Sequence, residues 1–221
     1  ATHDQFSQLA SRIKGRGDTI SGELVVTSLI ELAGWMTPVL VAFQKENPDI
    51  TVRFLTGERL FRLEYGEAHV AIRAGSAPDQ PDNVVQPFIT LKVGFYAHKS
   101  YVDKFGIPAS IEEYVNHRFV VHDDMQMRAP FFQWMHKVVP KAAMTFRCLD
   151  SKALTEAILS GAGIGFLKLR DAKDNPDLIE IHPRLSEWDS PLWLVTHVDL
   201  HRTPKVQALV KFLKNSTKGV V

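Results

Sequence analysis

The sequence has few of the features that mark several large protein classes. Its single cysteine, Cys148, excludes an internal disulfide bond, and no apolar run approaches the ~20 residues that a membrane-spanning helix needs. The 26 basic and 25 acidic side chains give a net charge of +1, without the basic excess that a DNA-binding domain usually carries. No secretory signal is present in the sequence as given. These features, and one unpaired thiol, favour a cytoplasmic protein that makes no membrane contact.

Motifs of catalysis and cofactor binding are also missing. The sequence has no nucleophile–base–acid arrangement, no phosphate-binding loop and no dinucleotide fingerprint. Three glycines at 161–165 lead into a predicted strand rather than a helix, which is the wrong context for a dinucleotide-binding turn. Residues 122–124 lack the spacing of a preformed metal site. The sequence therefore predicts a protein that is not an enzyme and has no cofactor and no metal.

Two glycine-punctuated segments, 22–31 and 148–167, are the most informative features that are present. Each combines an apolar run, a short hydroxyl or acidic turn, and a helix. In such a unit the helix N-terminus lies over the carboxyl end of a strand, where an anion or a small polar ligand binds readily. Two such turns in one chain indicate one cleft that is lined from both sides.

The order of predicted elements indicates an α/β fold. Residues 24–26 form a buried strand, and Ser28 with Glu31 forms a capping box for the helix that follows. Residues 50–54 and 70–72 form two further strands, with a short helix between them. This βαβαβ order implies parallel strands with right-handed crossovers. Further strands are predicted at 119–121, 144–149, 178–181 and 192–195, with an extended stretch at 88–97 and a last helix from Pro204.

Taken in order, these landmarks resemble the effector-binding (regulatory) domain of LysR-type transcriptional regulators. Each motif is weak by itself, but their order and spacing over roughly residues 22–213 make the match specific. The family usually has Asp where this chain has His69. The amphipathic helix at residues 3–14 resembles the end of the linker helix that follows the family's DNA-binding domain. The matching stretches are 22–26, 38–43, 47–52, Gly57, 63–73, 154–167 and 204–213.

The resemblance implies two subdomains of the periplasmic-binding-protein type 2 fold, joined by crossover strands near 88–93 and 192–196. It also implies that a small-molecule effector binds between them, and that the domains form homodimers and often tetramers. DNA would be bound through the N-terminal domain that the family places before this one. The expected organisation is a linker-helix end and connector at 1–21, subdomain I at 22–91 plus 194–221, and subdomain II at 92–193.

The residues expected to bind the effector follow from this resemblance. Hydroxyls at the first strand end suit a carboxylate, and Arg73 offers a fork of donors. Glu58 would repel an anion unless a cation such as Arg73 neutralises it, which argues against a simple organic acid. Helix capping and a salt bridge between Arg73 and Glu58 are the structural alternatives. The expected set is Thr27, Ser28, Thr56, Gly57, Glu58, Arg73, His122, Asp150, Ser151 and Phe166.

Two other functions remain open from the sequence. A solute-binding protein of a transporter would share the same fold. A redox-sensing regulator would act through Cys148, next to a helix N-terminus, or through the methionines of residues 125–144. A buried, inert thiol and methionines that pack in the core are the structural alternatives.

Overall fold

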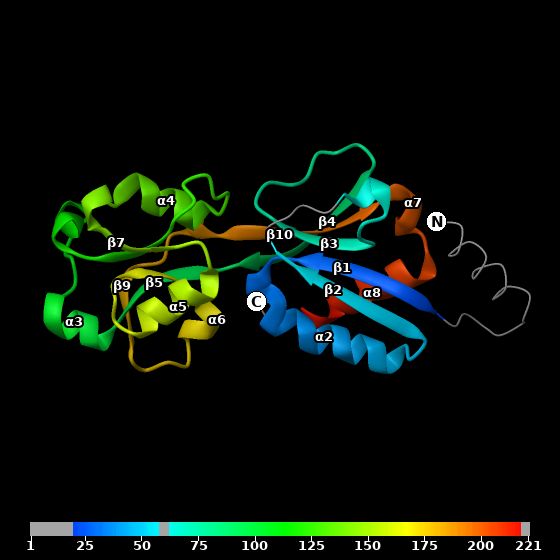
Figure 1. Cartoon of the computed structure of the whole chain (residues 1–221), viewed down its shortest axis with the longest axis horizontal. Helices are drawn as coiled ribbons and strands as arrows, with labels where there is room; N and C mark the ends of the chain where they lie inside the picture. The colour runs from blue at the N-terminus through cyan, green and yellow to red at the C-terminus, as the bar shows by residue number, and fades with distance from the viewer. Residues whose placement is uncertain (1–19, 58–61, 218–221) are drawn as a thin grey trace, which may run out of the picture. The chain divides into compact units, whose positions relative to one another are not determined.

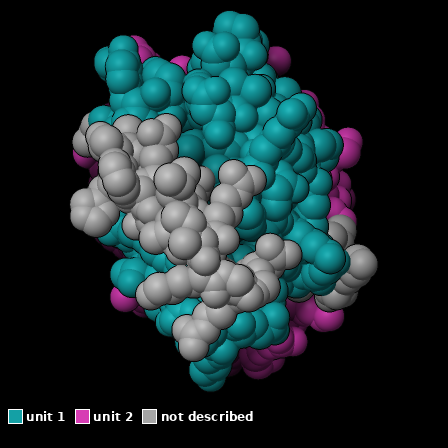
Figure 2. Space-filling view, turned by 90° about the vertical axis from the view of Figure 1, so that its right-hand side faces the viewer, with its two compact units in different colours: residues 1–89, 191–221 teal, residues 90–190 magenta. Residues whose placement is uncertain are grey.

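The computed structural model describes residues 20–57 and 62–217 (Figure 1). The chain divides into two compact units, shown in separate colours in Figure 2. Unit 1 comprises residues 1–89 and 191–221, and unit 2 comprises residues 90–190. The chain therefore passes between the units twice, whereas the sequence placed these boundaries at 91/92 and 193/194. The helix expected at residues 3–14 lies outside the described residues.

Unit 1 is built on a five-stranded sheet with the order β2-β1-β3-β10-β4 (Figure 1). Strand β1 runs parallel to both β2 and β3, as the βαβαβ order predicts, and β10 returns antiparallel to β3. Parallel strands with the same direction place their carboxyl ends at one edge of the sheet. The strands are β1 Gly22–Ser28, β2 Ile50–Thr56, β3 Val70–Ala74, β4 Asn83–Leu91 and β10 Ser190–His197.

Two long helices pack together in unit 1, α2 (Ala33–Glu46) and α8 (Pro204–Ser216). Helix α2 buries Met36, Leu40 and Phe43, whose spacing places them on one face. The Phe43 ring meets the Phe212 ring edge-on at 5.4 Å between centroids. The unit is completed by α7 Val198–His201 and the short 3₁₀ turns η1 Ile30–Leu32 and η2 Leu63–Tyr65.

Unit 2 holds a three-stranded sheet, β8-β5-β9, and a parallel pair, β6-β7. An isolated bridge between Phe119 and Ile164 connects the two sheets. The strands are β5 Val93–His98, β6 Phe119–His122, β7 Met144–Cys148, β8 Gly165–Lys168 and β9 Leu178–His182. The helices are α3 Lys99–Phe105, α4 Pro130–Val138, α5 Ser151–Leu159 and α6 Leu169–Ala172, with 3₁₀ turns η3 Ile111–Asn116, η4 Lys141–Ala143 and η5 Ser186–Trp188.

An aromatic cluster forms the centre of unit 2. Phe95 on β5 is 0% exposed, and its ring lies 4.8 Å from Phe166 and 6.1 Å from Trp188. Offset and edge-on ring pairs of this kind add about 0.5–1.5 kcal/mol each beyond the area that they bury. The cluster therefore gives a rigid base to the turns at the ends of the strands. Its other rings in contact with Phe95 are those of Tyr114, Phe119 and Trp134.

The three glycines at 161–165 serve turn and packing roles. Gly161 follows α5 with a φ of +77°, a left-handed conformation that favours glycine. A Cβ on Gly163 would lie 2.5 Å from the backbone oxygen of Arg118. A Cβ on Gly165 would lie 2.6 Å from the side chain of Ile158. The glycines thus allow the segment that enters β8 to pass close to α5 and to the backbone at the start of β6, in the strand-entering context that the sequence indicated.

Within residues 20–57 and 62–217, no helix combines the length and the apolar character that crossing a bilayer requires.

Candidate functional site

Unit 1 brings five of the expected residues to one edge of its sheet, which we call the unit 1 rim. Thr27 and Ser28 end β1, and Ser28 pairs in register with Thr56 at the end of β2. The backbone N–H of Gly57 donates to the carbonyl of Ser28 at 3.4 Å. Arg73 lies near the end of β3, the other neighbour of β1. Glu58, the remaining expected residue of this group, lies outside the described residues.

Ser28 does not cap the helix that follows it, so that sequence prediction is wrong. Its hydroxyl donates to the carbonyl of Leu29 at 3.0 Å. Leu29 keeps an extended conformation, with φ −62° and ψ 143°, so the helical turn begins one residue later than a capping box at Ser28 requires. Ser28 is 3% exposed and its hydroxyl is held by its own chain at the rim.

Arg73 is the cationic side chain of the unit 1 rim. Burial lowers its pKa, because desolvation disfavours the guanidinium charge, and the nearby Glu64 carboxylate acts in the opposite direction. Glu64 is thus a described acid that acts on Arg73, and the expected salt bridge to Glu58 lies outside the described residues. Trp193 pairs with Arg73 across β10 and β3, and its indole N–H donates to the carbonyl of Gly75 at 2.8 Å. The sequence placed Trp193 in a predicted strand but did not indicate that it would lie beside Arg73.

In unit 2, the carboxyl ends of β6 and β7 and the turns after them form a second edge, the unit 2 rim. His122 pairs in register with Cys148. The His122 side chain is 1% exposed, with Nε2 2.9 Å from the carbonyl oxygen of Leu149 and Nδ1 3.1 Å from the backbone nitrogen of Asp124. Because a backbone N–H can only donate, Nδ1 accepts and the ring is neutral with its proton on Nε2. The ring therefore ties together the two turns of the rim.

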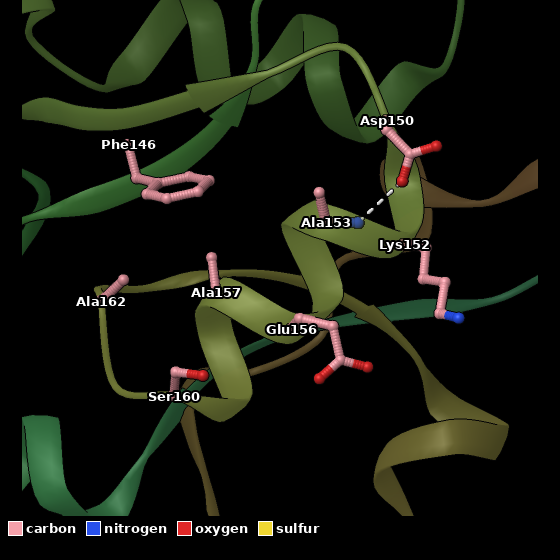
Figure 3. A pocket seen from close by; sticks show the side chains of 8 residues that line it. All are labelled: Phe146, Asp150, Lys152, Ala153, Glu156, Ala157, Ser160 and Ala162. Atoms are coloured by element: carbon pink, nitrogen blue, oxygen red, sulfur yellow. Dashed lines mark hydrogen bonds between the residues drawn. The ribbon is translucent and has the colours of Figure 1, made fainter.

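Asp150 and Ser151 begin helix α5 on the same rim. A carboxylate oxygen of Asp150 accepts from the backbone N–H of Ala153 at 2.8 Å, as Figure 3 shows. This is an N-cap, the structural alternative that the sequence left open. The carboxylate occupies the helix N-terminus, where an anion would otherwise be favoured. Beside it, Arg147 and Asp123 form an ion pair at 2.5 Å.

Phe166 reaches the unit 2 rim only through a series of ring contacts. It is 8% exposed on β8, and its ring centroid lies 5.4 Å from that of Phe131. Phe131 lies 4.5 Å from Phe132, which in turn lies 5.3 Å from His122. Phe166 therefore supports the rim from within the aromatic cluster.

Cys148 ends β7 and is partly buried. Its sulfur accepts from the backbone N–H of Asp150 at 3.4 Å. The methionines differ in access, since Met135 is 0% exposed and Met125 is 51% exposed. In the described part of the chain, no three His, Cys, Asp or Glu side chains are grouped so as to hold a metal ion.

A shallow hollow beside the unit 2 rim was not found from the sequence. It has a volume of about 570 Å³ and lies between β7 and the outer face of α5 (Figure 3). Phe146 on β7 contributes an aromatic ring to this hollow, and the residue is 39% exposed. The alternation of a strand, with polar Thr145 and Arg147 on either side, would instead place Phe146 on the inward face, so nothing in the sequence indicated its exposure. The lining residues are Phe146, Asp150, Lys152, Ala153, Glu156, Ala157, Ser160 and Ala162.

Comparison with known proteins assigns the family. The family model described as the LysR substrate binding domain matches residues 17–218, so the chain belongs to this family. An HTH-type transcriptional regulator of Xanthomonas campestris pv. campestris (strain 8004) is 26% identical over 197 residues, which are 81% of this chain and 54% of that protein. The uncharacterized HTH-type transcriptional regulator YcaN of Escherichia coli (strain K12) is 27% identical, over 71% of this chain and 52% of that protein. The chain thus spans about half the length of these relatives.

Solved structures show the same fold. The regulatory domain of CrgA, a LysR-type transcriptional regulator from Neisseria meningitidis, has a TM-score of 0.73 at 20% identity, covering 89% of this chain and 98% of that one. The regulatory domain of AphB from Vibrio vulnificus has a TM-score of 0.70 at 18% identity, covering 87% and 98%. These comparisons confirm the expected fold class, an α/β domain of two periplasmic-binding-protein-like halves. The regulators among the relatives do not favour the solute-binding alternative.

Proposed function

We propose that this chain is the effector-sensing and self-association part of a LysR-type transcriptional regulator, and that the unit 1 rim and the unit 2 rim hold its candidate effector-binding residues. The observation that carries the proposal is that each unit gathers polar side chains at the carboxyl ends of its parallel strands. Ligands of open α/β sheets bind at such edges. DNA would be bound by another part of the regulator, and the role of this part is regulatory rather than catalytic.

The chemistry of the two rims differs, and this difference restricts the effector. The unit 1 rim offers the hydroxyls of Thr27 and Thr56 and the guanidinium of Arg73, which suit an anionic or hydrogen-bond-accepting group. The unit 2 rim has its helix N-terminus already occupied by the Asp150 carboxylate. A second anion there would meet like charge. The unit 1 rim therefore suits an anionic or accepting group of an effector, and the unit 2 rim suits a neutral or cationic group.

The expected residues take different parts in this proposal. His122 and Phe166 hold the unit 2 rim in place, since both are buried and engaged with their own unit. Glu58, which lies outside the described residues, stays a proposed contact. The other proposed direct contacts are Thr27, Ser28, Thr56, Gly57, Arg73, Asp150 and Ser151.

A thermal-shift screen of a metabolite panel tests the proposed effector site. A ligand that binds only the folded state raises its stability by about 2.7 kcal/mol at 100 times its Kd. We expect a hit whose shift is lost in Thr27→Val and Ser28→Ala. Thr51→Val is the matched control, because Thr51 lies at the other end of β2 and is exposed. A hit whose shift survives in both rim variants would contradict the proposed site.

We place self-association at the hollow beside α5. Strand β7 is an edge of its two-stranded sheet, and unpaired strand edges are prone to association. The exposed ring of Phe146 and the small side chains of Ala153 and Ala157 give this edge an apolar surface that a second copy of the chain would cover. Members of the family typically self-associate, which supports a second copy of the chain as the partner that covers this surface.

Sedimentation velocity tests this surface. We expect Phe146→Asp to convert a dimer into monomers, because a buried carboxylate would lack a partner. Val115→Asp is the matched control, since Val115 is also in unit 2 and is 58% exposed on η3, away from the hollow. Equal dimer fractions in the wild type and in Phe146→Asp would contradict this placement.

A further inference from the structure

A second histidine lies beside the one that ties the unit 2 rim together. Helix α4 carries Phe132 and His136 four residues apart, which places them on one face. Phe132 packs against the His122 ring at 5.3 Å. Both ring nitrogens of His136 are buried and neither makes a well-formed hydrogen bond among the described residues, although the His122 backbone lies close enough to act on the ring. Buried polar atoms without partners are rare in proteins, so this imidazole needs an explanation beyond packing.

The surroundings of His136 favour its neutral form. Its pKa is lowered, first because burial disfavours the charged ring and then because His122 and Arg147 lie close by. The backbone of His122 and the Asp124 carboxylate act in the opposite direction. A protonated His136 would therefore be drawn toward Asp124 and the His122 backbone. The titratable and charged groups on α4 itself and on the elements in contact with it are His122, Asp123, Asp124, Lys137, Arg147, His182 and Glu187.

The tie made by His122 involves the same residue, Asp124, through its backbone N–H. Its Nδ1 accepts from the backbone N–H of Asp124, and its Nε2 donates to the carbonyl of Leu149. The side chain of Asp124 holds its own turn by accepting from the backbone N–H of Gln126 at 2.8 Å. A charged His136 that attracts the Asp124 carboxylate would weaken the two hydrogen bonds made by Asp124, one from its backbone N–H to His122 and one from Gln126 to its carboxylate.

We propose that protonation of His136 opens the unit 2 rim by breaking the contact through which the His122 ring holds its two turns together. We call this arrangement the latch. With His136 neutral, His122 joins the turn at 123–124 to the turn at 149–150. A proton taken up by His136 draws Asp124 away from His122 and separates the two turns. The regulatory consequence rests on the proposed function, because it assumes that this rim contacts the effector: acidification would then weaken effector binding.

The pH range follows from the direction of the shift. The pKa of His136 in the folded chain lies below its ordinary value of 6.5. The neutral form is therefore the one that stabilises the fold, and its contribution is complete above about pH 6.5 and is lost as the pH falls through the lowered pKa. The latch is closed at pH 7.5 and opens on acidification.

Hydrogen exchange of the Asp124 amide, followed by NMR on the whole chain at pH 7.5 and pH 5.5, tests the latch without any effector. After correction for intrinsic exchange, we expect protection to fall at least about tenfold at pH 5.5, as a local opening of the turn requires. His136→Leu should keep the protection at both pH values, and His136→Gln is a second non-titrating variant that retains polarity. His98→Asn is the control, because His98 caps α3 elsewhere in unit 2 and Asn preserves a capping acceptor.

Two outcomes would overturn the latch. One is equal protection of the Asp124 amide at pH 7.5 and pH 5.5 in the wild type. The other is a tenfold fall that persists in both His136→Leu and His136→Gln. Neither outcome bears on whether a metabolite binds at the rims, so failure of the latch is distinct from failure of the proposed function.

Discussion

Replacing Gly163 with alanine should destabilise unit 2 by an amount that the structure allows us to work out. The added Cβ would lie 2.5 Å from the backbone oxygen and 2.9 Å from the backbone carbon of Arg118. These are backbone atoms, so the contact cannot be relieved by turning a side chain. The carbonyl of Arg118 also accepts from the N–H of Ile164 at 2.8 Å, and the carbonyl of Ile164 accepts from Val120 at 2.8 Å.

Overpacking of this kind costs about 1–3 kcal/mol. For a chain of this size, 1 kcal/mol lowers Tm by about 2–4 °C, so Gly163→Ala should melt about 2–12 °C below the wild type. Gly34→Ala is the matched control, because Gly34 lies in helix α2 and a Cβ there meets nothing within 4 Å. Alanine is the better helix former, so this control should be neutral or stabilised by up to about 1 kcal/mol.

Urea denaturation, followed by circular dichroism, measures both variants as free energies of unfolding. We expect Gly163→Ala to lie at least about 1 kcal/mol below Gly34→Ala, with an unchanged m value. If Gly163→Ala were as stable as the wild type, the close approach between Gly163 and the Arg118 backbone would not hold, and the packing account of the glycine segment would be wrong.

Two further predictions concern unit 2. Asp150→Ala should lower the free energy of unfolding by about 1 kcal/mol through loss of the α5 cap, while Asp150→Asn should retain most of the stability that the cap provides. Equal losses of the two variants in urea denaturation would contradict the capping role. The Tyr101 hydroxyl accepts from the Arg118 N–H at 2.9 Å and lies 3.1 Å from Nδ1 of His117. Burial lowers the pKa of His117, and Glu113 acts in the opposite direction. The contribution of neutral His117 to the free energy of unfolding should therefore be complete above about pH 6.5 and should fall at lower pH. An NMR titration that gave His117 a pKa above 6.5 would refute this.

The elements predicted from the sequence are those whose signals are local. Continuous apolar runs such as 24–26 and 70–72 become buried strands, and their βαβαβ order is enough to predict parallel pairing. The role of Ser28 was mistaken because a one-residue offset in where a helical turn begins leaves no trace in a capping pattern. The burial of His136 and the exposure of Phe146 depend on which strands and helices meet, and this comes from contacts between distant segments rather than from local sequence.

The central claim is that a small molecule binds at the polar strand ends that form the rims. The most direct test is an NMR titration of the isotope-labelled chain with a metabolite that raises its Tm in the thermal-shift screen. We predict that the largest chemical-shift changes fall on the rim amides, those of residues 27–28 and 56–57 in unit 1 or those of residues 150–151 in unit 2. Changes that leave both rims unaffected would contradict the claim.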